Sequence, residues 1–456
     1  MIGSLFSRRR PPPMTLPDPA IVVPGITATY LRDDYPLPPE VIWRVLPFQK
    51  HFGSACLHPD DLRYEAREPA LIRPGPLYEV AYKELIDELR YDLSPSPEAE
   101  VPVYPFAYDW RKPLDMIEAD LDAFIDEVIE RTVLTRHYYK DGYDCRRTVT
   151  LIGHSMGGLI IAGFLQATGG LRTRRRRTCP DHRVSKVISL ASPFRGSFEA
   201  VVKMTTGTAD LGLGASSSRE REAARLTPAL YHLLPSFDEG LEVPAPLPRT
   251  LFDPQVWQPS ILRSIETFVA RTSPITRTVR KRTEALFAGL LDQARTHRER
   301  LDAFRLDQAG LGPRDWLAVV GCGADTRTRL TIAALEDGPS FVLTSDDRRN
   351  TWPNGTDTGD GTVPFLGAEP SFLDRANLVC VTPDDYGYWE LEDKALTRFG
   401  GGFHGILPNM NMLHRLIVRF VTGAPDPHQK TWGRPAPGVR PDAWDPPIPG
   451  LRNKAL

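Results

Sequence analysis

The feature that most constrains the fold of this chain is an uncharged run over residues 148–171. Its length reaches that of a membrane-spanning helix, but six glycines together with His154 and Ser155 oppose that interpretation. Residues 148–153 are rich in β-branched side chains and predict a strand, whereas residues 158–165 predict a buried helix. We therefore expect a strand, a sharp turn and a helix here, and no membrane span.

The turn itself reads Gly153-His154-Ser155-Met156-Gly157, which is the G-x-S-x-G pattern of a nucleophile elbow. A serine on such a strained turn projects its hydroxyl from the edge of a sheet, and small neighbours leave it the necessary room. The helix behind it supplies amide donors and a positive dipole where an oxyanion would form. The alternative is a tight glycine turn with an incidental serine, but the flanking strand and helix favour Ser155 as a nucleophile.

Other short apolar runs predict further strands that are buried on both faces. They lie at residues 20–23, 101–104, 148–153, 187–191, 317–320 and 378–381. Helical patterns lie between some of them, most clearly at 117–128, where one apolar stripe faces acidic side chains on the rest of the wheel. Strands that alternate with helices predict an α/β fold with a mostly parallel sheet.

The spacing of these signals also predicts how the chain is divided. Strand patterns become rare after Ser197, and helical stretches dominate up to Asp315, which indicates an inserted cap or lid. We predict an N-terminal arm at 1–19, an α/β core at 20–200 and 310–422, and a largely helical cap at 201–309. The proline-rich tail at 423–456 has few aliphatic residues and is expected to be an extended wrap or disordered.

A serine nucleophile needs a histidine base and a carboxylate that orients it, and in this fold their order is Ser, acid, His. Among the histidines that follow Ser155, His404 lies in the glycine-rich segment GGGFHG, which we interpret as a loop that carries the base. His414 lies inside an apolar helical pattern and is the alternative, better explained as a packing or surface residue.

The segment Gly359-Asp360-Gly361-Thr362-Val363-Pro364 places a carboxylate in a tight turn before His404. An ordinary Asp-Gly turn is the alternative, but the elbow and His404 favour Asp360 as the acid. Asp357 is the nearest competitor, and its spacing from Asp360 does not complete a calcium-loop pattern.

An acyl-transfer site also needs two oxyanion donors, one of them usually an amide in a loop after an early strand. Pro24 and Gly25 end the strand at 20–23, so the Ile26 amide could meet the tetrahedral oxygen together with the amide of Met156. A simple Pro-Gly turn is the alternative interpretation.

These pieces, taken in order along residues 20–420, resemble the lecithin:cholesterol acyltransferase family of lipases and acyltransferases. Further matching segments are YPFAYDWR at 104–111, ISLASPFRG at 188–196, YHLLP at 231–235 and VGCGADT at 320–326. The resemblance implies an α/β-hydrolase core with a cap, a triad of Ser155, Asp360 and His404, and an acyl group taken from a lipid ester.

The aromatic segment at 104–111 is expected to contribute to substrate binding through Tyr108 and Trp110, with Trp110 facing the acyl group. Asp109 and Arg111 are expected to brace the pocket through an internal ion pair. A role for these residues as buried scaffold is the alternative. Animal members of the family carry a lid disulfide, whereas Cys56 has no obvious nearby partner in this sequence.

Composition excludes several other classes of protein. The 56 basic and 58 acidic residues give a net charge of −2, so no global field favours nucleic acid or an anionic membrane. Five scattered cysteines without a C-x-x-C pair argue against a metal knuckle or a disulfide framework. We expect no metal, no cofactor and no nucleic-acid partner. Because no signal peptide or membrane helix is visible, the expected location is cytoplasmic.

One basic cluster could give a local contact with an anionic membrane, although a solvated loop is the simpler interpretation. It consists of Arg172, Arg174, Arg175, Arg176 and Arg177.

The sequence thus predicts a serine acyl hydrolase or O-acyltransferase that acts on a lipid or another hydrophobic ester. Two alternatives stay open, a non-catalytic lipid-binding or scaffold protein with a hydrolase fold, and a phospholipase toxin or effector.

Overall fold

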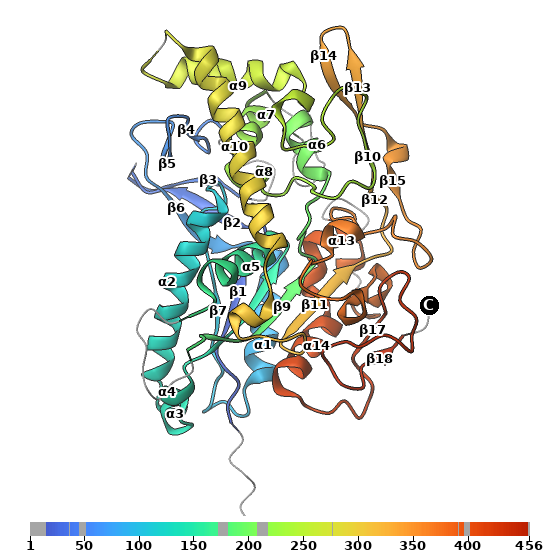
Figure 1. Ribbon diagram of the computed structural model, residues 1–456. Coiled ribbons are helices and arrows are strands. Elements are labelled where there is room, and N and C mark those ends of the chain that lie inside the picture. Colours follow the sequence, from blue (N-terminus) through green and yellow to red (C-terminus); the bar gives the residue numbers. More distant parts are fainter. Residues whose placement is uncertain are drawn as a thin grey trace, which may run out of the picture.

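A computed structural model describes most of the chain (Figure 1). The described residues are 15–35, 37–44, 52–171, 181–207, 218–275, 277–390, 392–395 and 402–454. The arginines at 172 and 174–177, which we considered for membrane contact, lie outside these ranges, so that contact stays a prediction.

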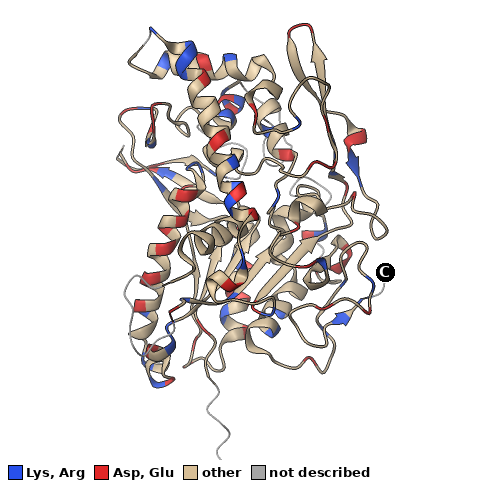
Figure 2. Cartoon of the chain, in the orientation of Figure 1, with Lys and Arg blue, Asp and Glu red and all other residues tan. Residues whose placement is uncertain are grey.

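The centre of the molecule is a parallel sheet of six strands in the order β16-β11-β9-β8-β1-β7. The strands are β1 (Ala20–Val23), β7 (Val103–Pro105), β8 (Val149–His154), β9 (Val184–Leu190), β11 (Trp316–Gly321) and β16 (Val379–Val381). Each of them overlaps one of the apolar runs that predicted a buried strand, so the sequence interpretation of the sheet is confirmed. In Figure 2 these strands are tan apart from Lys186 in β9, whereas charged side chains spread over the outer helices.

Helices cover both faces of this sheet because its strands alternate between two apolar cores. In β1, Ile21 and Val23 face one core, and Ala20 and Val22 face the other. The first core packs against α2 (Leu114–Val133) and α5 (Met156–Thr168), and the second against α1 (Glu79–Leu93) and α14 (Asn411–Thr422). This three-layer arrangement is the predicted α/β fold.

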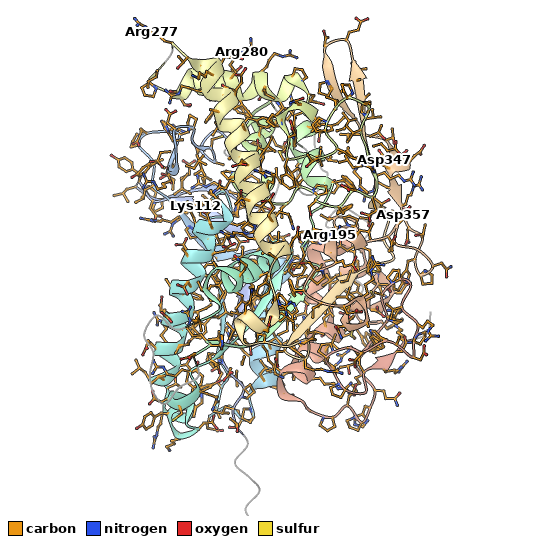
Figure 3. All side chains as sticks on the ribbon, in the orientation of Figure 1. Lys112, Arg195, Arg277, Arg280, Asp347 and Asp357 are labelled. Atoms are coloured by element: carbon orange, nitrogen blue, oxygen red, sulfur yellow. The ribbon has the colours of Figure 1, made fainter. Side chains whose placement is uncertain are left out.

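A second group of elements lies beyond the sheet's carboxyl edge, at the top of Figure 1. Its helices are α6 (Glu199–Thr206), α7 (Ser218–Arg225), α8 (Pro228–Tyr231), α9 (Pro259–Thr272) and α10 (Val279–Asp302). The hairpin of β13 (Leu330–Leu335) and β14 (Gly338–Val342) pairs with β10 (Leu241–Glu242). We call these elements the cap. In Figure 3, Arg277 and Arg280 mark the outer end of α10.

The described chain also contains other short strands and α-helices. The strands are β2 (Thr29–Asp33), β3 (Glu40–Trp43), β4 (Leu57–His58), β5 (Asp61–Glu65), β6 (Ile72–Leu77), β12 (Thr326–Arg327), β15 (Arg348–Arg349), β17 (Trp432–Gly433) and β18 (Arg452–Asn453). The helices are α3 (Arg136–Lys140), α4 (Tyr143–Arg146), α11 (Phe365–Ala368) and α13 (Gly402–Ile406). The division of the chain into arm, core, cap and tail stays a prediction.

The C-terminal segment is an extended wrap that contacts the edge strand β16 of the central sheet. Its strand β17 pairs with β18, and the backbone of Arg434 exchanges two hydrogen bonds with Cys380 of β16, at 2.9 and 3.1 Å. The Asp385 carboxylate then binds Arg434 at 2.5 Å and Lys454 at 2.9 Å. In the described part of this segment the chain is extended, while its division from the core as a tail stays a prediction.

The uncharged run at 148–171 forms β8, a turn and α5, as predicted. None of the helices in the described ranges has both the length and the apolar character of a membrane span.

Candidate active site

Ser155 occupies the turn between β8 and α5 in a backbone conformation that side chains rarely adopt. Its φ is 54° and its ψ is −126°, and its amide is held by the carbonyl of Leu190 at 2.9 Å. Glycines permit this turn, since a Cβ on Gly157 would lie 2.1 Å from the Val23 carbonyl oxygen. The elbow is therefore packed directly against the carboxyl end of β1.

The structure brings together the three side chains that the sequence suggested as a triad. Ser155 Oγ lies 2.8 Å from Nε2 of His404, and Nδ1 of His404 lies 2.7 Å from Oδ2 of Asp360. All three residues are buried. Both distances are hydrogen-bond distances, so the histidine can accept the serine proton at one nitrogen while the other donates to the carboxylate.

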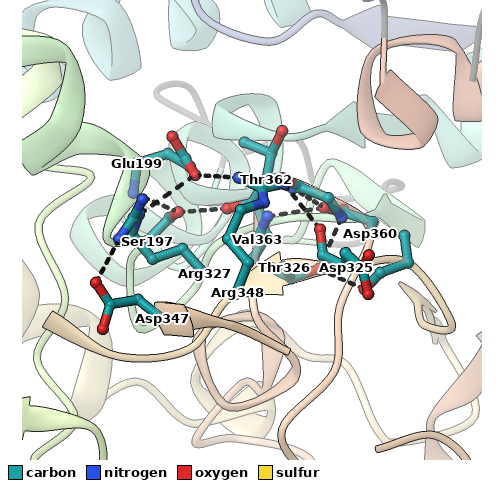
Figure 4. A network of polar contacts seen from close by, with 12 residues as sticks. Ser197, Glu199, Asp325, Thr326, Arg327, Asp347, Arg348, Asp360, Thr362 and Val363 are labelled. Atoms are coloured by element: carbon teal, nitrogen blue, oxygen red, sulfur yellow. Dashed lines mark hydrogen bonds and ion pairs between the residues drawn. The ribbon is translucent and has the colours of Figure 1, made fainter. Parts of the chain in front are cut away.

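The acid is held by a network of polar contacts (Figure 4). Oδ1 of Asp360 accepts the amides of Thr362 at 2.9 Å and Val363 at 2.7 Å, which leaves Oδ2 for the histidine. The Gly361 amide donates to Thr326 Oγ1 at 2.8 Å, and the Arg348 guanidinium donates to the Gly361 carbonyl at 2.9 Å. Asp360 thus lies in a hydrogen-bonded turn that binds one carboxylate oxygen and directs the other to His404.

His404 was expected in a flexible loop, and that expectation is wrong. It lies in the short helix α13, and its amide donates to the Asp360 carbonyl at 3.1 Å. The glycines before it suggested a loop, but the buried neighbours Phe403 and Ile406 anchor this turn of helix in the second core. The alternatives lie elsewhere: His414 is buried in α14 with Nε2 2.7 Å from the Pro408 carbonyl oxygen, and Asp357 pairs with Arg349.

The two amides suggested as oxyanion donors flank the serine. Met156 is the first residue of α5, directly after Ser155. Ile26 follows Gly25, where an added Cβ would lie 3.0 Å from Ser155 Cβ and 3.3 Å from its Oγ. Among the contacts recorded between described residues, neither amide has a backbone acceptor. Their role as oxyanion donors stays a prediction that this placement supports.

Tyr108 and Trp110, suggested as substrate-binding residues, are both buried beside the loop at residues 24–29. Tyr108 Oη donates to the Pro24 carbonyl at 2.7 Å, and Trp110 Nε1 donates to the Thr29 carbonyl at 3.0 Å. The ion pair expected between Asp109 and Arg111 is confirmed, with nitrogen to oxygen distances of 2.8 and 2.6 Å. These contacts support the loop that carries Ile26, while contact with an acyl group stays a prediction.

Two further side chains next to the triad had no role in the sequence interpretation. They are His154, the variable residue of the G-x-S-x-G pattern, and Tyr82 of α1. Tyr82 carried no sequence signal because it belongs to an ordinary amphipathic helix, and only the fold brings it to the elbow.

A buried acid and base connect α10 of the cap to α2, beside the helix α5 that follows the nucleophile. Glu118 of α2 lies 2.6 Å from Nε2 of His297 in α10, beside Gly163 of α5. Burial raises the pKa of Glu118 from 4.5 to about 7 and lowers the pKa of His297 to about 3. Near neutral pH the pair is therefore close to losing the proton that it shares.

The Glu118 carboxyl predicts a pH-dependent contribution to stability. The raised pKa of Glu118 means that the folded protein binds its proton more tightly than the unfolded chain, so this contribution is complete below pH 4.5 and is lost as pH rises through about 7. Glu118 alone should lower the free energy of unfolding by about 3 kcal/mol over this range. The lowered pKa of His297 acts in the opposite direction below pH 6.5, so the contribution of Glu118 is the difference between the urea-unfolding pH profiles of the original protein and Glu118→Gln.

Glu118→Gln should remove the Glu118 contribution, because the amide does not titrate, and should leave a free energy of unfolding that rises with pH up to about 6.5 because of His297. Glu284→Gln is the matched control, since Glu284 is an exposed carboxylate on α10 that pairs with Arg280. A Glu118→Gln variant whose pH profile runs parallel to that of the original protein would show that Glu118 does not titrate in this range.

Comparison with known proteins shows one family to which part of this sequence is similar. Residues 82–265 match the model of the lecithin:cholesterol acyltransferase family, which confirms the resemblance found in the motifs. These residues include the elbow but end before Asp360 and His404. No curated protein matches the chain.

Among solved structures, a chain from the crystal structure of the Tle4-Tli4 complex matches with a TM-score of 0.56 and 15% sequence identity. The match covers 90% of this chain and 100% of the other. At this identity it shows the fold, an α/β-hydrolase core, and the whole length of the solved chain is represented here.

Proposed function

We propose that this chain, whose residues 82–265 match the lecithin:cholesterol acyltransferase family, is a serine-dependent acyl hydrolase or O-acyltransferase acting on a lipid or another hydrophobic ester. The observation that carries the proposal is the unbroken set of contacts from Ser155 Oγ through His404 to Asp360, with distances of 2.8 and 2.7 Å. The family match supports a lipid as the source of the acyl group.

The proposed reaction begins when Ser155 Oγ attacks the ester carbonyl and gives its proton to Nε2 of His404. Asp360 accepts the Nδ1 hydrogen, orients the ring and stabilises the imidazolium. The amides of Ile26 and Met156 would donate to the oxyanion of the tetrahedral intermediate. His404 then returns the proton to the leaving alcohol as the carbon to oxygen bond breaks, and an acyl-enzyme remains.

The second half of the reaction decides between the two activities. His404 removes a proton from water or from an acceptor alcohol, which attacks the acyl-enzyme and releases Ser155. Water gives a free fatty acid, whereas an alcohol held in a dry site gives a new ester. Profiling the products formed from a mixed lipid extract, with and without an added sterol, would show which acceptor is used.

A fluorophosphonate probe tests the proposal against the non-catalytic alternative. The hydroxyl of Ser155 should attack its phosphorus atom and expel fluoride, which leaves a stable covalent adduct. We expect labelling of the original protein, a mass increase on the peptide that contains Ser155, and no labelling of Ser155→Ala. A folded original protein that fails to react and hydrolyses no ester would favour a lipid-binding or scaffold role.

A further inference from the structure

Two buried side chains, Tyr82 and His154, join three segments of the candidate active site. Tyr82 Oη accepts the Gly25 amide at 2.9 Å and lies 2.6 Å from Nδ1 of His154. Nε2 of His154 lies 2.9 Å from the carbonyl oxygen of His404. Both side chains are almost fully buried, Tyr82 with 1% and His154 with 4% of its surface exposed.

Only one placement of hydrogen atoms satisfies these hydrogen bonds when the imidazole of His154 is neutral. The His404 carbonyl can only accept, so Nε2 of His154 carries a hydrogen and donates it. Burial, and then the nearby His404, lower the pKa of His154 well below its ordinary value, so the ring is neutral and Nδ1 is an acceptor. The Tyr82 hydroxyl therefore donates to Nδ1, and its oxygen receives the Gly25 amide.

We propose that Tyr82 and His154 are positioning residues that fix the oxyanion loop and the base relative to the nucleophile. This inference rests on the proposed function. This series of hydrogen bonds starts at the Gly25 amide, next to the Ile26 amide. It passes through Tyr82 and His154, the residue before Ser155, and ends at the backbone carbonyl of His404. It thus contacts all three parts of the site, although they are far apart in the sequence.

The geometry shows why such a connection matters for the reaction. Gly25 lies against Ser155, so a shift of this loop would move the Ile26 amide relative to the attacked carbonyl. A shift of the His404 backbone would likewise change the approach of Nε2 to Oγ. Displacements of about 1 Å can lower a rate roughly 100-fold, whereas ground-state binding of an apolar acyl chain depends on other contacts. Loss of the hydrogen bonds through Tyr82 and His154 should therefore change kcat more than KM.

The test measures hydrolysis of a p-nitrophenyl ester by Tyr82→Phe, His154→Phe and the double variant. Tyr82→Phe keeps the ring but leaves the Gly25 amide and Nδ1 of His154 without a partner. We expect kcat to decrease about 10- to 100-fold with KM within about threefold, and the rate of fluorophosphonate labelling to decrease in parallel, since the phosphonate oxygen would occupy the oxyanion position. The double variant should lose little more than the more affected single variant, because each change breaks the same chain.

Tyr143→Phe is a matched control for the loss of a buried tyrosine hydroxyl. Tyr143 is fully buried, and its Oη donates to the Thr148 carbonyl at 2.8 Å, beyond the opposite end of β8. The kcat of Tyr143→Phe should equal that of the original protein, even if the melting temperature of this variant decreases as much as that of Tyr82→Phe. Active-site titration with the fluorophosphonate would normalise every kcat to the folded fraction.

Several results would overturn the inference. They are a Tyr82→Phe kcat within twofold of the original value, a change confined to KM, an equal loss of kcat in Tyr143→Phe, and a double variant whose loss is the product of the two single losses. The Ser155→Ala variant shows whether only the positioning role of Tyr82 and His154 is wrong, or the proposed function as well. If Ser155→Ala is inactive while Tyr82→Phe is fully active, only the positioning role is wrong, and if Ser155→Ala retains activity, the proposed function itself is wrong.

Discussion

Replacing His404 with alanine is expected to lower kcat for ester hydrolysis roughly 10⁴- to 10⁶-fold while the protein stays folded. The change removes the only side chain that contacts both Ser155 Oγ, at 2.8 Å, and the Asp360 carboxylate, at 2.7 Å, among the contacts recorded for the described residues. Without a base, the serine hydroxyl is a weak nucleophile at neutral pH. Steady-state kinetics with a p-nitrophenyl ester would measure the loss, and circular dichroism would confirm the fold.

His414→Ala is the matched control, because His414 is also a buried histidine and was the alternative base. Its Nε2 lies 2.7 Å from the Pro408 carbonyl oxygen, and its side chain packs within α14. We expect this variant to be less stable but to keep its kcat. A folded His404→Ala protein with kcat within tenfold of the original, or a folded His414→Ala protein without activity, would contradict the assignment of the base.

Gly157→Ala is expected to lower the free energy of unfolding by about 3 kcal/mol and to abolish most of the activity. The added Cβ would lie 2.1 Å from the Val23 carbonyl oxygen and 3.0 Å from that of Pro24. Both obstacles are backbone atoms, so they cannot rotate away as a flexible side chain could. The strand end must move, and with it the Pro24-Gly25-Ile26 segment beside Ser155. Urea unfolding and ester hydrolysis would measure the two effects.

Gly289→Ala is the control for this substitution. Gly289 lies in the exposed part of α10, and no atom outside its local helix lies within 4 Å of an added Cβ. Alanine favours a helix more than glycine does, so this variant should be up to about 1 kcal/mol more stable. Equal stability of Gly157→Ala and the original protein would mean that the elbow and β1 are less tightly packed than the structure has them.

The central sheet and the elbow could be predicted because each depends on local sequence, whereas the order of the candidate triad came from the fold that they imply. Strands that are buried on both faces must be continuously apolar, and all six runs of this kind became strands of one sheet. The elbow needs glycines at fixed positions around Ser155, which is also a local requirement. Asp360 lies in an Asp-Gly turn that is common in proteins, so it was chosen only because it stands between the elbow and His404 in the sequence.

Other parts of the structure could not be predicted because they depend on contacts between distant segments. The sheet of β2, β3 and β6 has charged and proline residues in its strands, so it lacks an apolar period. The β13-β14 hairpin joins the cap through β10, a strand of two residues. Tyr82 is one of several apolar positions of α1, and only the packing of that helix under the elbow distinguishes it.

The position of His404 shows how tertiary packing can override local propensity. Three glycines precede Phe403, and they favour a loop. Phe403 and Ile406 are nevertheless buried against the sheet, and the His404 amide is bonded to Asp360. The base is thus held by the same backbone that carries the acid, which a flexible loop would not provide.

The C-terminal wrap has a consequence for solubility. β16 is the last strand of the central sheet, and unpaired backbone groups on such a margin can recruit strands from other molecules. Arg434 occupies those groups at Cys380, and the Asp385 carboxylate fastens the segment through Arg434 and Lys454. We therefore expect a chain shortened before β17 to self-associate through the exposed edge of β16, even though its Ser155, Asp360 and His404 are intact.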